Sequence, residues 1–200
     1  MAIKFQYNKT SLQQLNKQLQ IRQRALPTLK NKESALRAEV KKAKDEAARL
    51  NKKYEEALEK YREGVHLWTE FPDDMVKVSN VTMTYRKIAG VSTPELDQVE
   101  FEVSPFLVFN QPKWFSEGIS ILKELASLLI EREVFLEKME LLDYARRKTT
   151  QKVNLYEKVQ IPGYEEAIRK IKRFLEDEEN LSKSAQKIVK NRQQKQKEAA

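Results

Sequence analysis

Residue types that usually carry chemistry are few in this sequence, and they lie far apart. Its four glycines, which are Gly64, Gly90, Gly118 and Gly163, are too widely spaced to form a glycine-rich loop that binds phosphate. The absence of cysteine excludes disulfides, thiolate metal sites and cysteine nucleophiles. His66 is the only histidine, which leaves too few groups for a histidine metal site or a serine–histidine–aspartate triad.

One run of acidic residues is left as a candidate site for a cation. The run comprises Glu176, Asp177, Glu178 and Glu179. In an α-helix of 3.6 residues per turn, four consecutive side chains point in different directions around the axis, so they do not converge on one ion. We therefore interpret the run as a solvated helix face. We predict no catalytic, cofactor-binding or metal-binding residues in this chain.

The overall composition favours an elongated helical protein over a compact globular one. Of the 200 residues, 40% are hydrophobic and 34% are charged, so little apolar surface is available for a deep core. An average chain of this length has about 14 glycines, whereas this one has four and hence few residues for tight turns. No apolar run approaches the ~20 residues that span a bilayer, and residues 1–4 do not begin an apolar signal segment. We expect a soluble intracellular protein.

Positive charge is concentrated at the two ends of the chain. The 38 Lys and Arg residues and the 30 Asp and Glu residues give a net charge of +8. Residues 1–32 contain seven basic residues and no acid, and residues 183–200 contain six basic residues and one acid, Glu198. If two long helices form a hairpin, both basic ends meet at one tip. Such a tip would attract an acidic partner or a phosphate backbone, unless it consists only of solvated ends.

Residues 12–68 carry hydrophobic residues at alternating spacings of three and four. This seven-residue repeat predicts a long α-helix that supercoils with a partner helix. Ser11 and Gln14 form a capping-box pattern at its start, and Pro27 is expected to kink the helix without ending it. The seam positions are Leu12, Leu15, Leu19, Arg22, Leu26, Leu29, Glu33, Leu36, Val40, Ala43, Ala47, Leu50, Tyr54, Ala57, Tyr61, Gly64 and Trp68, of which Arg22, Glu33 and Gly64 are not apolar side chains.

Residues 71–112 change to the period of β-strands. A Phe-Pro-Asp-Asp run at residues 71–74 ends the helical pattern, and Gly90 and Pro94 mark the turn region. The segment contains six acidic and three basic residues, so we predict a β-hairpin in the acidic part of the chain. The alternating apolar positions are Val76, Val78, Val81, Met83, Tyr85, Val99, Phe101 and Val103.

From about residue 115 the helical spacing returns. Pro162 and Gly163 are expected to kink or briefly interrupt this second helix, and the last ten or so residues are expected to fray. The fold class predicted is mainly α, with a long antiparallel two-helix coiled coil and a small β-hairpin subdomain between the helices. The expected divisions are an N-terminal coiled-coil helix at 1–70, the hairpin and connecting segment at 71–112, and a C-terminal coiled-coil helix with a frayed basic tail at 113–200. The stripe of the second helix comprises Ile121, Leu125, Leu128, Phe135, Met139, Leu142, Ala145, Val153, Tyr156, Ile161, Tyr164, Ile168, Ile171 and Leu175.

Three short segments match the sequence motifs of one known family, in the family's order and layout. The segments are residues 29–32 with Leu36, residues 88–91 with Pro94, and residues 153–157 with Ile161 and Pro162. Their sequences are Leu-Lys-Asn-Lys, Ile-Ala-Gly-Val and Val-Asn-Leu-Tyr-Glu. Together they make the chain resemble the D subunits of the V-type (V/A-type) rotary ATPases, which are the central rotor shafts of those complexes.

The resemblance implies a non-catalytic subunit that transmits torque between an ATP-handling ring and a membrane rotor ring that translocates ions. Its implied partners are the catalytic ring of A and B subunits, the small F subunit of the stalk, and a socket subunit on the membrane rotor. It implies no cofactor, no direct contact with nucleic acid, no insertion into the membrane, and a cytoplasmic location peripheral to the membrane. The coupling ion (H⁺ or Na⁺), the main direction of ATP turnover and the coil face that binds the small F subunit stay open.

Two other classes of protein share the pattern of helix, hairpin and helix. A prefoldin-like holdase chaperone also joins two coil helices through β-hairpins, but it grips clients with apolar helix tips, and the tips here are basic. A nucleic-acid-binding coiled-coil arm would use the basic ends of the chain. Single-stranded nucleic acid is usually bound by aromatic residues interleaved with basic ones, and the basic ends contain only Phe5 and Tyr7 as aromatic residues.

Overall fold

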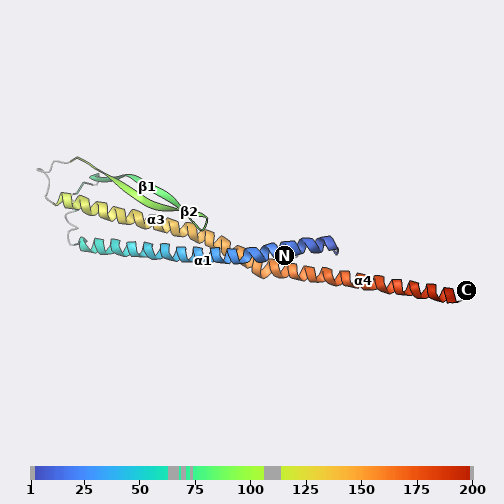
Figure 1. Ribbon diagram of the computed structural model, residues 1–200. Helices are drawn as coiled ribbons and strands as arrows, with labels where there is room; N and C mark the ends of the chain where they lie inside the picture. Colours follow the sequence, from blue (N-terminus) through green and yellow to red (C-terminus); the bar gives the residue numbers. More distant parts are fainter. Residues whose placement is uncertain (1–2, 63–67, 69–70, 73, 106–113, 199–200) are drawn as a thin grey trace. The chain divides into compact units, whose positions relative to one another are not determined.

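The computed structural model describes residues 3–62, 68, 71–72, 74–105 and 114–198, and it confirms the mainly α fold with a β-hairpin between helices (Figure 1). The elements are α1 (Lys9–Lys60), β1 (Val76–Ile88), β2 (Val91–Val103), α3 (Phe115–Asn154), the π-helical stretch η3 (Leu155–Gln160) and α4 (Ile161–Glu198). They form two compact units, which we call the terminal unit (residues 1–31 and 149–200) and the hairpin unit (residues 32–148).

Helix α1 begins at Lys9, and its cap residue lies three residues before the predicted one, so the predicted capping box at Ser11 and Gln14 is wrong in register. The side-chain Oδ1 of Asn8 accepts a hydrogen bond from the backbone N–H of Ser11 at 2.6 Å, which makes Asn8 the N-cap. The Ser11 hydroxyl in turn accepts a bond from the backbone N–H of Gln6 at 3.3 Å. Asparagine is among the best N-cap residues because its short side chain reaches the free N–H groups of the first turn.

Helix α1 continues through Pro27, as predicted, and it ends at Lys60. Proline removes one backbone hydrogen bond, but Pro27 is exposed while Leu26 and Leu29 beside it are partly buried, so packing on the opposite face is retained. In the sequence the seam pattern continues beyond Lys60 to Trp68. Of these later seam positions, Gly64 lies outside the described residues. Every described seam position is buried or partly buried, including Arg22 and Glu33.

The two helical segments of each unit run antiparallel. In the terminal unit, Leu15 packs in a cluster with Ala167, Ile168 and Ile171. Seven residues further along α1, Arg22 bonds to Gln160, which precedes that cluster in the sequence, so the two segments run in opposite directions. In the hairpin unit, Asn51 of α1 bonds to Arg132 of α3, while Val40 and Met139 line one groove and Tyr61 and Gly118 another. The predicted stripe of the second helix is also buried or partly buried at every position.

The hairpin turns at Ala89 and Gly90, which have φ values of 48° and 80°. Two central residues with positive φ are the signature of a type I′ turn, whose twist matches that of paired strands. The prediction of a turn at Gly90 is confirmed. The placement of Pro94 in the turn region is wrong, because Pro94 lies within β2 opposite Tyr85 and is fully buried.

One of two irregularities in the strand pairing explains the change of phase in the β1 pattern. Val78 pairs with Phe101 and Asn80 pairs with Glu100, so Ser79 is an extra residue in β1. An inserted residue shifts the alternation by one position, which is why the apolar residues of β1 change from even numbers to odd numbers after this point.

The predicted interruption near Pro162 appears as a change of helix type. In η3, the backbone N–H of Ile161 donates to the carbonyl of Tyr156, five residues back. Proline at 162 cannot donate to the preceding turn, so the helix loses a regular bond there without breaking. Helix α4 then continues to Glu198, where the sequence predicted frayed residues, and every residue from 176 to 195 is exposed.

Candidate functional site

Arg22 is the polar exception in the seam of the terminal unit, and its polar atoms find partners both across the helix pair and on α1 itself. Its Nε donates to Gln160 Oε1 at 2.6 Å, and its Nη1 donates to the side-chain oxygen of Gln18 at 2.6 Å. The guanidinium carbon lies 4.7 Å from the ring centroid of Tyr164 and 5.9 Å from that of Tyr156. Gln160 is the last residue of η3, so this crossing joins α1 to the π-helical stretch by hydrogen bonds and to both tyrosines by cation–π contacts.

Arg132 is the corresponding polar crossing of the hairpin unit, and it is less completely bonded. Its Nη1 donates to Asn51 Oδ1 at 3.0 Å, and its Nη2 lies 3.6 Å from a carboxylate oxygen of Glu133. Its Nε is buried and has no hydrogen-bond partner among the described residues. A buried donor without a partner costs free energy, so this crossing contributes less stability than that of Arg22.

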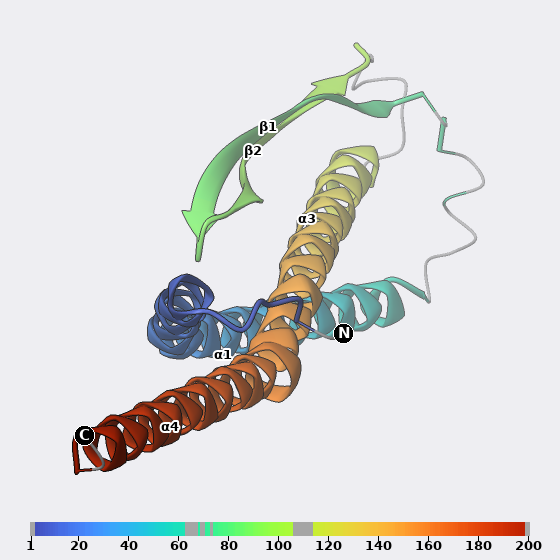
Figure 2. The ribbon, with the colours of Figure 1, turned by 90° about the vertical axis from the view of Figure 1, so that its right-hand side faces the viewer.

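The hairpin is anchored on α3 by an ion pair. Lys138 Nζ lies 2.9 Å from Glu95 Oε1, and the lysine side chain is only 12% exposed. The hydrogen bond from Lys138 is the main cause that lowers the pKa of Glu95 below its usual value. At the other end of the hairpin, Gly90 lies close to Lys32 of α1. A Cβ added to Gly90 would lie 3.5 Å from Lys32 Nζ. Figure 2 shows this turn end of the hairpin approaching α1.

A second charged group lies along α3 itself. The two carboxylate oxygens of Asp143 accept bonds from Arg146 Nε at 2.8 Å and from Arg147 Nε at 2.7 Å. The Arg146 bond is the main cause that lowers the pKa of Asp143. A carboxylate held between two guanidinium groups stays ionised, so we assign it a structural role along α3.

An aromatic cluster closes the described end of the hairpin unit. Phe71, Trp114 and Phe115 contact one another with ring centroids 4.9–5.7 Å apart, and Trp68 joins them. A Cβ added at Gly118 would lie 3.0 Å from the Trp114 ring and 3.2 Å from the Phe71 ring. From the sequence, Gly118 is notable only as one of four glycines too widely spaced for a phosphate-binding loop. The spacing of Trp114 and Gly118, one helical turn apart, is the signal that indicates a close ring contact.

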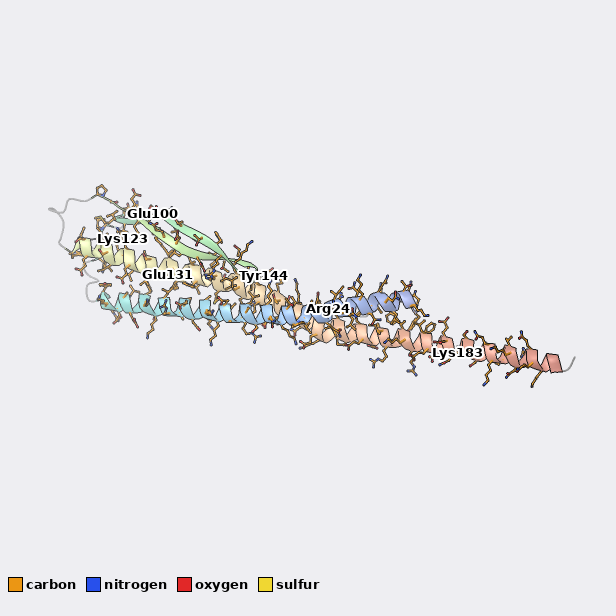
Figure 3. The ribbon with its side chains drawn as sticks, in the orientation of Figure 1. Arg24, Glu100, Lys123, Glu131, Tyr144 and Lys183 are labelled. Atoms are coloured by element: carbon orange, nitrogen blue, oxygen red, sulfur yellow. The ribbon has the colours of Figure 1, made fainter. Side chains whose placement is uncertain are left out.

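The prediction that the two basic ends meet at one tip holds only for the start of the C-terminal segment, where Lys183 and Lys9 both lower the pKa of Glu179. The N-terminal segment folds back, so that Ile3 contacts Gly163 and the ring of Tyr7 lies 4.9 Å from that of Phe174. Helix α4 extends beyond this contact, and the side chains around Lys183 project outward with no other segment of the terminal unit beside them (Figure 3). The apolar residues Ile3 and Phe5 explain the fold-back, because they cover the cluster around Leu15.

The acidic run at 176–179 is exposed, as predicted for a solvated face. Glu179 bonds to Lys183 at 2.7 Å, and this bond is the main cause that lowers the pKa of Glu179. Among the described residues, no group of three acidic or histidine side chains is arranged to hold a metal ion. His66 lies outside the described residues. None of the helices in the described part of the chain is both long enough and apolar enough to cross a bilayer.

Antiparallel helix pairing with a β-hairpin inserted in sequence between the two long helical segments defines a coiled-coil protein with an inserted β-hairpin. A family model that describes the D subunit of ATP synthase matches residues 11–191, which is most of the chain. The chain therefore belongs to the family of ATP synthase D subunits, and the resemblance drawn from its three sequence motifs is confirmed.

Curated relatives cover nearly the full length of the chain. A protein of Borreliella burgdorferi, named as the D subunit of V-type ATP synthase, is 30% identical over 190 residues, which is 94% of each chain. A protein of the same name from Chlamydia pneumoniae is 30% identical over 182 residues, or 88% of this chain and 87% of its own. The Chlamydia muridarum protein, also of that name, is 28% identical over 203 aligned positions that cover 99% of this chain and all of its own.

Proposed function

We propose that this chain is the central stalk, or rotor shaft, of a V-type rotary ATPase. In this role it transmits torque between an ATP-handling ring of A and B subunits and a membrane rotor ring that translocates ions. The observation that carries the proposal is the seam, because α1 runs for 52 residues and each of its seam positions is buried or partly buried. A helix pair packed along its whole seam resists twisting of one helix against the other, which a shaft requires.

The polar crossings support this role. Arg22 and Arg132 each join α1 to the opposite helical segment of its unit by hydrogen bonds. Sliding or rotation of one helix against the other would break these bonds and leave partly buried polar atoms without partners. The shaft performs no catalysis in this proposal, and ATP is handled by the partner ring. The chain is then a cytoplasmic protein held at the membrane through its complex.

We assign the ends of the shaft by their surface chemistry. The basic part of α4, residues 183–197, enters the ring of A and B subunits, where acidic side chains would attract it. The end with the aromatic cluster of Trp68, Phe71, Trp114 and Phe115 reaches the socket subunit on the membrane rotor. The small F subunit packs beside the coil.

The first experiment is a pull-down of the tagged full-length chain from its native cell extract, followed by protein identification and an ATPase assay. We expect an active ATPase ring together with one small partner protein in defined stoichiometry. Recovery of mixed unfolded clients, or of RNA, without ATPase subunits would contradict the shaft role and favour the chaperone or the nucleic-acid alternative.

A second experiment tests torque transmission in the recovered complex. A chain that ends at Ser182 lacks the basic arm but retains the helix pairing of both units, so it should fold while losing ATP-driven ion transport. A matched full-length variant with Leu181 and Ile188, both exposed, changed to Gln keeps length and charge. Retained coupling in the shortened complex would contradict the assignment of this arm.

A further inference from the structure

Strand β1 has an outer edge that no other strand covers among the described residues. In the described part of the chain the sheet has two strands, and β2 is the strand that faces the helices, through Pro94 and through the pair between Glu95 and Lys138. Of the 13 residues of β1, all but Val76, Val81 and Ile88 are exposed. Open strand edges carry unpaired N–H and C=O groups that can pair with another chain.

The two strands differ in the features that protect a sheet edge. Strand β2 contains Pro94 and four acids, and Pro94 cannot donate a ladder hydrogen bond. Strand β1 contains no proline and no acid, and residues 78–85 form a neutral run rich in Val, Thr and Tyr. Three large apolar side chains of that run are exposed: Val78 by 44%, Met83 by 41% and Tyr85 by 70%. Such a run on an open edge favours the addition of a strand.

Basic residues flank the neutral run on both sides. Lys77 precedes it, and Arg86 and Lys87 follow it. On the inner side of the ribbon, Lys77 lies opposite Glu102 of β2, and Arg86 helps to lower the pKa of Glu95. The inner neighbour of β1 is therefore an acidic strand, and the outer edge presents the same basic residues to solvent.

These charges disfavour a second copy of the chain as the outer neighbour. If two copies of β1 paired antiparallel with full overlap, Lys77 of one would lie opposite Lys87 of the other, at both ends of the pair. Parallel pairing in register would place each basic residue beside its own copy. Like charges directly opposite one another destabilise a strand pair, so self-pairing is opposed in both directions.

We propose that the outer edge of β1 binds an extended, acidic segment of a partner protein as a third strand of the sheet. Because Ser79 is an extra residue in β1, the segment that fits has acidic residues nine positions apart, on opposite faces of the strand, across from Lys77 and Lys87; this spacing is about 30 Å along a strand. Between them it has neutral residues with apolar side chains at alternate positions, to cover Val78, Met83 and Tyr85. Backbone hydrogen bonds supply affinity in this mode, and the charges set specificity and register. The proposal goes beyond the shaft role and does not depend on it.

The probe is a 12-residue synthetic peptide with Glu at its second and eleventh positions and, between them, Val at the even positions and Thr at the odd positions. It is added to the full-length chain, and backbone amide resonances and amide hydrogen exchange are followed by NMR. We expect shifts along β1 and slower exchange at its outward N–H groups. A peptide with Lys in place of both Glu residues should bind at least about tenfold more weakly, since the charge pairs become repulsive.

A charge-reversed chain separates strand addition from unspecific binding. The double variant Lys77→Glu and Lys87→Glu should reverse the preference, binding the Lys peptide more tightly than the Glu peptide. The matched control carries Lys41→Glu and Lys53→Glu on an exposed part of α1, has the same net charge, and should keep the original preference. Equal binding of both peptides, unchanged exchange at β1, or dimers formed by the unmodified chain through this edge would overturn the proposal.

Discussion

Arg22 in the terminal unit and Arg132 in the hairpin unit occupy similar places, yet they are bonded to different extents. Arg22 bonds to Gln18 and Gln160 and contacts two tyrosine rings. Arg132 bonds to Asn51, but its buried Nε has no partner among the described residues. The terminal unit has the wide π-helical turn of η3 at its crossing, whereas α3 is a regular α-helix at Arg132. A polar residue that crosses between two helices therefore stabilises the pair most when local backbone geometry brings acceptors to it.

The largest expected effect tests whether the two units are stabilised separately. Leu36 in the hairpin unit and Ile171 in the terminal unit have no exposed surface, so Leu36→Ala or Ile171→Ala should each cost about 2–5 kcal/mol. Urea unfolding followed by circular dichroism measures the loss. If the units unfold separately, each variant shifts only the transition of its own unit. Leu181→Ala is the control, because Leu181 is 72% exposed and the change should cost less than about 0.5 kcal/mol.

The next effect compares the two arginines directly. Arg22→Met should cost about 1–3 kcal/mol, because it removes charge-assisted hydrogen bonds and leaves Gln160 without its donor. Arg132→Met should cost less, since it also removes a buried N–H group that has no described partner. Urea midpoints of the two variants, measured under identical conditions, give the difference. Equal costs, or a larger cost at Arg132, would contradict the comparison.

The hairpin turn distinguishes the hairpin unit from the terminal unit, and its backbone geometry is a source of strain. Gly90→Ala should destabilise the chain by about 1–2 kcal/mol, because the φ of 80° is unfavourable for a residue with a Cβ. Ala89→Gly relieves similar strain at φ 48° but makes the unfolded chain more flexible, so the net change should be small. Thermal unfolding checks both. Gly163→Ala is the comparison at a helical glycine without positive φ, where an added Cβ gains helix propensity but would lie 3.1 Å from Ile3 Cδ1.

The smallest expected effect is the dependence of stability on pH. Lys138 lowers the pKa of Glu95, and Arg146 lowers the pKa of Asp143, so in both cases the folded chain favours the ionised carboxylate. The resulting stabilisation is present above the carboxyl pKa of the unfolded chain, about 4, and it is lost as the pH falls through the lowered folded pKa. Asp143→Asn should therefore flatten the fall in stability below about pH 4.

The corresponding control for pH lies in the terminal unit. Lys170 lowers the pKa of Glu166, but this pair is at the surface of α4, where water screens the interaction. Glu166→Gln should leave the acid limb of the stability curve nearly unchanged. If Glu166→Gln changed the fall in stability at low pH more than Asp143→Asn does, burial would not determine how much each ion pair contributes to stability.

Much of the fold follows from patterns that are local in sequence. The seven-residue repeat identified the seam of α1 and the stripe of the second helix, because a helix can bury only one face and that face recurs every three to four residues. The turn at Gly90 was also predictable, since a two-residue hairpin turn needs positive φ. The start of α1 was misplaced because Asn8 and Ser11 are both good capping residues, and the sequence does not say which one bonds.

Other features depended on contacts between distant residues. The sequence placed Pro94 in a turn, whereas contact with α3 places it in a buried strand. The role of Gly118 depends on two aromatic rings, one of which is 47 residues away at Phe71. The bonds of Arg22 to Gln160, of Arg132 to Asn51 and of Lys138 to Glu95 join different elements, so they have no sequence signature.

By itself the sequence determined which faces of the helices are buried, where the hairpin turns and which family the chain resembles, because each depends on residue types at short, regular spacings. The tertiary structure decided how the polar exceptions in the seam are bonded, how the N-terminal segment folds back, and which edge of the hairpin stays open. These depend on which atoms of distant residues meet. Hydrogen bonds and close packing act only over a few ångströms, so their outcome is decided when the chain folds and not by neighbouring positions in the sequence.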